Sequence, residues 1–325
     1  MRLAVGLSAL VTALFAAALL VGYVPAPAGE AWRALLSGEG ALGLVMREIR
    51  LPRAILAVMT GASLGMAGAA MQGYLRNPLA EPGIIGVTAG AGLGAVIALQ
   101  SGLAAAWALG LPALALTGAA VAVGLILLLA GPRGSSRTLI LAGIAISALA
   151  TAMTSLVLNL SPNPFAAAEI VFWMLGSLDD RSFTHVWVAL PFVAVGLALL
   201  ATLGRGLDAL TLGEDAAASL GISLVAMRWA LVIGTASAVG AVTAVAGAIG
   251  FVGLVVPHVL RRWVGGRPSA LLWASALGGA ALVLAADIAV RVALPDRDLK
   301  LGVLMALIGA PFFLHLIWRT REEMA

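Results

Sequence analysis

Long uninterrupted runs of apolar residues dominate the chain. A helix crosses about 30 Å of hydrocarbon with roughly 20 apolar residues. The run over residues 82–132 is long enough for two spans with a Gly/Pro break near Gly110 to Pro112, and the run over residues 229–260 holds one span plus a shorter piece. The pattern therefore predicts nine or ten spans. The stretches without Asp, Glu, Lys or Arg are residues 3–29, 54–75, 82–132, 138–168, 182–204, 229–260, 268–286 and 301–318.

The composition agrees with a membrane protein. Hydrophobic residues make up 62% of the chain, charged residues only 10%, and the mean hydropathy is +1.08, whereas soluble domains carry about 25% charged residues. A transmembrane β-barrel would show alternation in segments of about ten residues, but these runs are continuously apolar. We therefore expect an all-α polytopic protein with a single domain over residues 1–325. Small-residue segments at 61–70 and 86–95 predict close helix contacts.

The first apolar run is expected to be an uncleaved span. It has about 20 apolar residues, longer than the usual 7 to 15 of a signal peptide. Residues 161–183, which include Phe172 and Trp173, are expected to form a longer outer connection whose helix lies partly in the membrane interface. The chain has no cysteine, so disulfides and cysteine metal sites are excluded.

The distribution of basic residues favours a cytoplasmic N-terminus. That orientation places eleven of the 19 Lys and Arg residues on the inner side, as the positive-inside rule requires. The remaining basic residues either extend to the membrane interface or meet a negatively charged partner outside. These outer residues are Arg33, Arg47, Arg50, Arg53, Arg181, Arg291, Arg297 and Lys300.

A short acidic segment, residues 209–222, stands between two runs that are long enough to span. Thr211 and Glu214 have the spacing of a capping box, Asp215 adds negative charge to the first turn, and Gly221 suits a left-handed stop. The expected helix has about nine residues, near 14 Å, which is too short to cross a bilayer.

One side of this helix is apolar, because Leu212, Ala216 and Leu220 recur every four residues. It is either a connector resting on the protein's own surface or a docking helix for a cytoplasmic partner. The single lysine, Lys300, excludes a phosphate-binding P-loop. Asp287 and Arg291 are expected to form a local ion pair rather than an ion-coupling site, so energy from a separate ATPase fits best.

Six motifs together resemble the FecCD-type permeases of type II ABC importers for iron-siderophore, haem and cobalamin. The resemblance covers nearly the whole chain. The motifs are REIRLPR (residues 47–53), NPLAEPGIIG (77–86), LGEDAAASLG (212–221), GAIGFVGLVVPHVLRR (247–262), LAADI (284–288) and LGVLMALIGAPFFL (301–314).

The resemblance implies a type II ABC importer permease fold with ten spans, both termini cytoplasmic, in a bacterial inner membrane. The implied partners are a second permease copy as a homodimer, two ATPase subunits, a periplasmic binding protein, membrane lipid and a chelated metal cargo. The chain itself would hold no cofactor, because ATP and Mg²⁺ belong to the ATPase, and it would not be an enzyme.

The resemblance also assigns roles to particular residues. It implies docking of the binding protein at Arg50, Arg53 and Arg291, and an inner gate near Ser136 and Arg137, although relatives often have uncharged residues at these two gate positions. Residues 205–227 would hold the coupling helices that reach the ATPase. The implied coupling residues are Leu212, Gly213, Glu214, Asp215, Ala216, Ser219, Leu220 and Gly221.

Other functions find little support in the sequence. His185, His258 and His315 are scattered without zinc spacing, and the net charge of +4 does not suggest a nucleic-acid partner. The alternative is an ion-coupled carrier or a channel, which would need ionisable groups in the bundle interior. The scarcity of such ligands favours a large organic chelate over a bare metal, with iron chelates as the broadest class and the exact cargo open.

Overall fold

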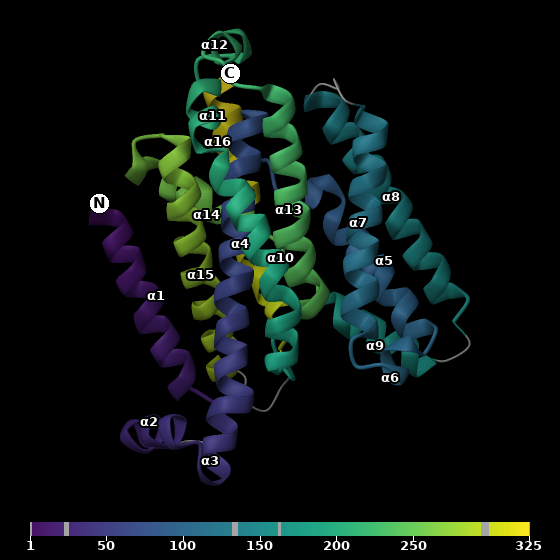
Figure 1. Cartoon of the computed structure of the whole chain (residues 1–325), viewed down its shortest axis with the longest axis vertical. Coiled ribbons are helices and arrows are strands. Elements are labelled where there is room, and N and C mark those ends of the chain that lie inside the picture. Colours follow the sequence, from purple (N-terminus) through teal and green to yellow (C-terminus); the bar gives the residue numbers. More distant parts are fainter. Residues whose placement is uncertain (1, 23–25, 132–135, 162–163, 294–298, 325) are drawn as a thin grey trace.

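The computed structural model describes residues 2–22, 26–131, 136–161, 164–293 and 299–324, and the regular elements in them are all helices (Figure 1). The all-α prediction is confirmed. The longer helices are α1 (Arg2–Leu20), α4 (Leu51–Leu75), α5 (Val87–Gln100), α7 (Gly110–Ala130), α8 (Ser136–Asn159), α10 (Phe183–Thr202), α13 (Leu224–Ala246), α15 (Pro268–Ala293) and α16 (Leu301–Met324). The shorter ones are α2 (Ala28–Ser37), α3 (Gly40–Leu44), η1 (Val45–Arg50), η2 (Pro82–Ile85), α6 (Leu103–Ala106), α9 (Pro164–Met174), α11 (Gly204–Leu210), α12 (Glu214–Ser219), α14 (Val252–Leu260) and η3 (Arg261–Val264).

The spans follow the apolar runs. Seven helices in the described part of the chain are long and apolar enough to cross a membrane, and two shorter apolar helices, Val87–Gln100 and Leu301–Leu316, accompany them. The expected break in the third run is confirmed, because α7 begins at Gly110. The expected short piece of the sixth run is α14, which has nine residues. Together these elements agree with about ten spans.

A long central helix organises the bundle. Residues Gly40–Leu75 form 36 consecutive helical residues, which at 1.5 Å per residue extend about 54 Å, well beyond about 30 Å of hydrocarbon. Its apolar window is 83% buried, so α4 lies in the centre with other helices around it. In Figure 1 this helix continues past the other spans toward α3 and α2.

Glycine allows α4 to approach its neighbours at backbone distance. A Cβ at Gly61 would lie 2.1 Å from the carbonyl oxygen of Gly279, and one at Gly65 would lie 2.0 Å from that of Ser275, both on α15. One at Gly68 would lie 2.0 Å from the carbonyl oxygen of Gly253 on α14. The close contacts predicted for residues 61–70 are therefore confirmed.

The second small-residue segment is used in the same way. A Cβ at Gly94 of α5 would lie 2.0 Å from the carbonyl oxygen of Leu114, and one at Gly90 would lie 2.6 Å from that of Gly118, both on α7. The prediction for residues 86–95 is also confirmed. In lipid, such contacts gain dispersion energy where no hydrophobic force drives helices together.

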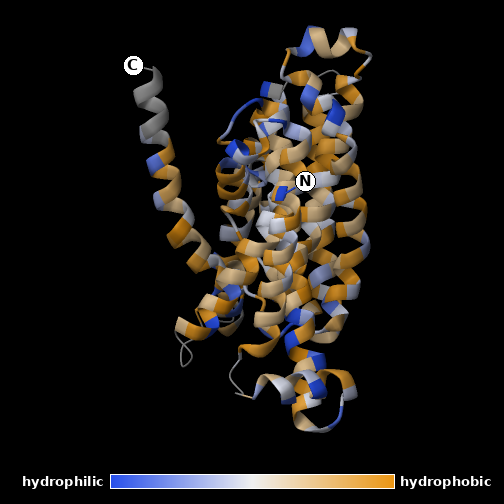
Figure 2. Cartoon of the chain, turned by 90° about the vertical axis from the view of Figure 1, so that its left-hand side faces the viewer, coloured by the Kyte–Doolittle hydropathy of each residue, from blue (hydrophilic) through white to orange (hydrophobic). Residues whose placement is uncertain are grey.

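The two ends of the bundle carry different short helices. In Figure 1, α2 and α3 lie at one end and α11 and α12 at the other. Following the orientation predicted from the basic residues, we call the α12 end the inner end and the α2 end the outer end. The C-terminal helix α16 stands apart from the bundle along much of its length (Figure 2), and Leu307, Leu314 and Trp318 on it are exposed.

The outer connection contains the expected helix, α9, but its two aromatic side chains differ. Phe172 is exposed, as an interfacial residue would be, whereas Trp173 is buried. Only Phe172 is therefore exposed as an interfacial side chain would be, and Trp173 is covered by the protein. The reason is tertiary: the carbonyl oxygen of Trp173 lies only 2.3 Å from where a Cβ of Gly247 would be, so α9 packs tightly on the end of α13 at this point.

Candidate functional site

The acidic segment forms a protruding helix at the inner end of the bundle. α12 projects beyond the spans in Figure 1 and is joined to α10 through α11. It contains six residues, Glu214–Ser219, and is therefore shorter than the nine expected. Both acidic residues, Glu214 and Asp215, lie in its first turn, where the helix dipole favours negative charge.

The predicted capping box is absent, and the start of α12 is built differently. Gly213, with φ of 105°, is the N-cap residue and no side chain caps the helix. Thr211 ends α11 with helical backbone angles, and its hydroxyl donates to the carbonyl oxygen of Asp208 at 2.7 Å. A Thr that back-bonds within its own helix is not available to the next one. The Glu214 carboxylate instead pairs with Arg76 Nη2 at 3.3 Å.

The end of α12 agrees with the sequence prediction. Gly221 has φ of 79°, and its N–H donates to the carbonyl oxygen of Ala218 at 2.9 Å. The N–H of Ile222 donates to the carbonyl oxygen of Ala217 at 3.1 Å. Gly221 therefore provides the left-handed stop that these two bonds require.

Two large apolar side chains on this segment are mostly exposed. Leu212 is 70% exposed and Leu220 is 64% exposed, whereas the small Ala217 is buried and Ala216 is half-buried. The hydroxyl of Ser219 donates to the Asp215 carbonyl at 2.9 Å and so is used locally. The segment thus rests on the protein through alanines and leaves both leucines exposed.

Sequence reasoning missed the attachment of α11 to the bundle. The Asp208 carboxylate accepts from the backbone N–H of Ser269 at 2.9 Å and from the Ser269 hydroxyl at 2.6 Å. Ser269 is the second residue of α15, so Asp208 satisfies N-terminal donors of that helix from another element. The bland composition of residues 204–210 contained no signal for this pairing, which joins residues 61 positions apart.

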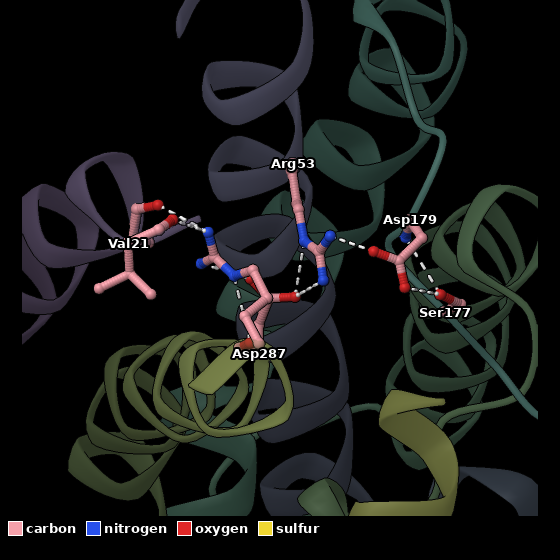
Figure 3. A network of polar contacts seen from close by, with 7 residues as sticks. Val21, Arg53, Ser177, Asp179 and Asp287 are labelled. Atoms are coloured by element: carbon pink, nitrogen blue, oxygen red, sulfur yellow. Dashed lines mark hydrogen bonds and ion pairs between the residues drawn. The ribbon is translucent and has the colours of Figure 1, made fainter. Parts of the chain in front are cut away.

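A buried charge cluster lies at the outer end. Arg53 of α4 binds Asp287 of α15 at 2.8 Å and also contacts the carboxylate of Asp179 in the loop before α10 (Figure 3). Asp287 pairs with Arg291 one turn later at 2.8 Å, which confirms the local ion pair expected from the sequence. Ser177 donates to Asp179 at 2.9 Å and fixes that carboxylate. The cluster joins α4, α15 and the outer connection.

The cluster also holds the end of α1. Arg291 donates to the carbonyl oxygens of Ala18 at 2.9 Å and Val21 at 2.5 Å, and Arg50 donates to those of Leu19 and Leu20 at 2.9 and 3.0 Å. These carbonyls belong to the C-terminal turn of a helix, which lacks internal partners and favours cations.

The predicted docking arginines are therefore occupied inside the protein. Arg50, Arg53 and Arg291 are 4%, 8% and 6% exposed. The sequence predicts that their side chains face an outer partner. They face inward because α1, the loop before α10 and α15 supply carbonyl and carboxylate acceptors that a single sequence does not place beside them.

Arg47 stays nearer the surface. It donates to the carbonyl oxygens of Leu35 and Leu36 in the last turn of α2.

A cavity of about 260 Å³, lined by both charged and apolar side chains, opens beside the charge cluster. It is lined in part by Glu169, Asp180, Arg181 and Lys300, and by Phe172, over whose ring the Lys300 ammonium lies at 6.0 Å. Burial lowers the pKa of Arg181, while the nearby carboxylates oppose this change. The outer connection thus carries charges of both signs around a small hollow.

The residues assigned to the inner gate lie at the start of α8. This helix begins at Ser136, and Arg137 is exposed there. The rest of the preceding loop, residues 132–135, lies outside the described residues, as does the Ser136 side chain. At the inner side of α14, the ring of His258 meets that of Phe312 edge-on at 5.6 Å and so joins α14 to α16.

Residues that would hold a metal do not gather anywhere in the described part of the chain. No group of three or more His, Asp or Glu side chains with suitable placement occurs among those residues. The features that stand out are therefore an exposed apolar segment at the inner end and a buried charge cluster at the outer end of one helix bundle.

Comparison with known proteins gives a consistent result. The profile of the FecCD transport family matches residues 10–319. The vitamin B12 import system permease protein BtuC of Salmonella paratyphi A is 38% identical over 298 residues, which cover 90% of each chain. Its counterpart from Klebsiella pneumoniae is 38% identical over 299 residues, covering 90% of this chain and 88% of that one.

Solved structures agree with the sequence relatives. An inward-facing structure described as a metal-chelate type ABC transporter matches with a TM-score of 0.86 and 30% identity, covering 98% of this chain and 99% of the other. PsaBC from Streptococcus pneumoniae matches with a TM-score of 0.54 and 15% identity, covering 88% of this chain and 94% of that one, which shows the fold alone. The chain therefore belongs to the FecCD transport family and is a membrane-spanning permease subunit of a type II ABC importer.

Proposed function

We propose that this permease carries cobalamin or a closely similar large metal chelate across a bacterial inner membrane. The observation that carries the proposal is the 38% identity to vitamin B12 import permeases over nine tenths of both chains. This changes the preference taken from sequence alone, which placed iron chelates first. Iron-siderophore and haem are the competing cargoes of the experiment below.

The energy comes from ATP hydrolysed on two separate subunits, and the permease works as a homodimer. A single lysine and no P-loop leave the chain without the usual phosphate-binding site. The exposed Leu212 and Leu220 suit contact with a cytoplasmic ATPase, and burying two leucines would contribute roughly 3 to 6 kcal/mol before the costs of association. ATP and Mg²⁺ would be bound there and not by this chain.

A periplasmic binding protein delivers the cargo to the outer end. Arg50, Arg53 and Arg291 are proposed to take part through their charge, because Arg53 and Arg291 pair with the carboxylates of Asp179 and Asp287, while Arg50 binds only carbonyl oxygens of α1 among the acceptors described above and adds a further positive charge. Surplus positive charge attracts an acidic partner and raises its association rate more than its affinity. Direct contact with these side chains would require displacing their present acceptors.

The docking role is tested by association kinetics. Arg50→Gln removes one positive charge and is expected to lower the on-rate of the binding protein several-fold at low salt, with the difference shrinking as salt rises. Arg267→Gln, at an exposed inner position, is the control and should leave the on-rate unchanged. If the on-rate of Arg50→Gln at low salt equals that of the wild type, the charge cluster has no role in docking of the binding protein.

The transport proposal is tested in proteoliposomes. The chain is reconstituted with its ATPase and binding protein, and uptake of labelled cyanocobalamin, a ferric siderophore and haem is compared with and without ATP. ATP-dependent uptake of cobalamin above the other two cargoes is expected. Preferential uptake of a siderophore or haem would reject cobalamin as the cargo. Uptake by the chain alone, without the ATPase, would favour the carrier or channel alternative.

A further inference from the structure

The coupling segment α11–α12 is tied to the bundle by a small number of side-chain contacts between elements. α11 packs against α15, α4 and α13: a Cβ at Gly204 would lie 3.3 Å from Ser269, one at Gly73 would lie 3.2 Å from Leu207, and one at Gly206 would lie 2.4 Å from Met227. These are apolar contacts, which have no preferred bond angle. A hydrogen bond adds a defined distance and orientation to such packing.

Asp208 makes the directional contact between α11 and α15. Both of its carboxylate oxygens are used, one by the Ser269 N–H at 2.9 Å and one by the Ser269 hydroxyl at 2.6 Å. Two bonds from one planar carboxylate fix orientation as well as distance. Both residues are half-buried, so the contact is screened less than a surface pair.

The second polar link, Arg76 to Glu214, is weaker. The two side chains are 53% and 54% exposed and their atoms are 3.3 Å apart, and exposed pairs of this kind contribute about 0–1 kcal/mol. Arg76 is the C-cap residue of α4, so this link reaches α4 while Asp208 reaches α15.

The helix that Asp208 holds is itself rigidly joined to α4. Backbone contacts at Gly61 and Gly65 lock α15 against α4 near the middle. At the far end, Arg53 binds Asp287 at 2.8 Å. A displacement applied to the inner end of α15 would therefore move the α4–α15 pair as one body, since close-packed interfaces do not deform continuously.

We propose that Asp208 is a positioning residue that makes the coupling segment and α15 move together, so that ATPase-driven motion of α12 reaches the transport pathway. This rests on the proposed function of the segment as the ATPase contact. Asp208 touches neither cargo nor nucleotide; it acts through Ser269. The role depends on the two hydrogen bonds to Ser269. An amide at position 208 should therefore preserve it, because the amide retains an acceptor for the Ser269 N–H and a donor for the Ser269 hydroxyl oxygen.

The variants separate this role from simple stability. Asp208→Ala removes both bonds, Ser269→Ala removes only the hydroxyl bond, and Asp208→Asn keeps the hydrogen-bonding geometry without charge. Thr202→Val is the matched control, because its hydroxyl donates only to the carbonyl of Leu199 within α10 at 2.6 Å. Each variant is first checked for assembly with the ATPase by size-exclusion chromatography.

Two measurements are made on the reconstituted complex. The first is the number of cargo molecules transported per ATP hydrolysed. The second is the distance between spin labels at Ala218→Cys on α12 and Ala270→Cys on α15, with and without nucleotide; both positions are exposed and the chain has no native cysteine.

The label distance is expected to stay narrow and unchanged by nucleotide in the wild type, Asp208→Asn and Thr202→Val. Asp208→Ala should broaden or shift it on nucleotide binding and lower transport per ATP about tenfold, within the range of ordinary coupling energies. Ser269→Ala should lie between the two.

An unchanged distance and unchanged transport per ATP in assembled Asp208→Ala would overturn the proposal. So would equal losses in Asp208→Asn and Asp208→Ala, since the amide keeps the bonds. Failure of the wild-type complex to transport with ATP would instead reject the proposed function, and the label distances would still decide whether Asp208 holds the two elements together.

Discussion

Arg53 and Asp287 form an ion pair of 2.8 Å between helices that lie 234 residues apart in the chain. The carboxylate is 1% exposed, and Arg291 approaches it from the other side at 2.8 Å. Desolvation of these charges is costly and is offset only while all partners are present. The outer ends of α4 and α15 are thus held by an interaction that tolerates little change.

Asp287→Ala is expected to lower the free energy of unfolding by about 3–5 kcal/mol, because two guanidinium groups would lose their buried partner. Glu214→Ala is the matched variant, since it breaks an exposed ion pair and should cost about 0–1 kcal/mol. Thermal unfolding in detergent measures both. Equal shifts in the two unfolding temperatures would contradict the importance assigned to burial.

Gly65→Ala should destabilise the bundle by about 1–3 kcal/mol, since its Cβ would lie 2.0 Å from the Ser275 carbonyl oxygen and force α4 and α15 apart. Gly92→Ala, at a helical glycine with nothing within 4 Å of the added Cβ, should be neutral or slightly stabilising. The comparison is made by thermal unfolding. A neutral Gly65→Ala would mean that the two helices do not need their backbone contact.

Gly221→Pro is expected to uncouple ATP hydrolysis from transport. Proline fixes φ near −65°, whereas Gly221 has φ of 79°, and it also removes the N–H that donates to Ala218. Gly221→Asn accepts a left-handed backbone and should retain most coupling. The measurement is stimulation of the ATPase by loaded binding protein, and normal stimulation in the proline variant would reject this prediction.

Leu212→Ser combined with Leu220→Ser should weaken binding of the ATPase at least about tenfold, because two exposed apolar side chains would no longer be buried at the interface. Thermal stability of the isolated permease should hardly change. Leu36→Ser, at an exposed outer position, is the control for loss of surface leucine. Unaltered ATPase affinity of the double variant would show that the partner contacts another surface.

Local patterns in the sequence determined the membrane spans, the close helix contacts and one ion pair of this protein. Run length predicted the spans, and the Gly and Pro residues near Gly110 predicted the break in the third run. Small residues predicted the close contacts at Gly61 and Gly65. The i, i+4 spacing predicted the Asp287–Arg291 pair. These features depend on one helix or on the bilayer, whose thickness and lack of hydrogen-bonding groups apply to every span. Six ordered motifs also indicated the family.

Only the tertiary structure decided which polar groups on different elements meet. Arg53 with Asp287, Arg50 with the carbonyls ending α1, and Asp208 with Ser269 join elements far apart in the sequence, and their pairing depends on which helices pack side by side. The same cause buried Arg50, Arg53 and Arg291, for which the sequence predicts an outward-facing role. A buried charge binds whichever acceptor the fold brings within about 3 Å, and spacing along a single chain does not contain that information.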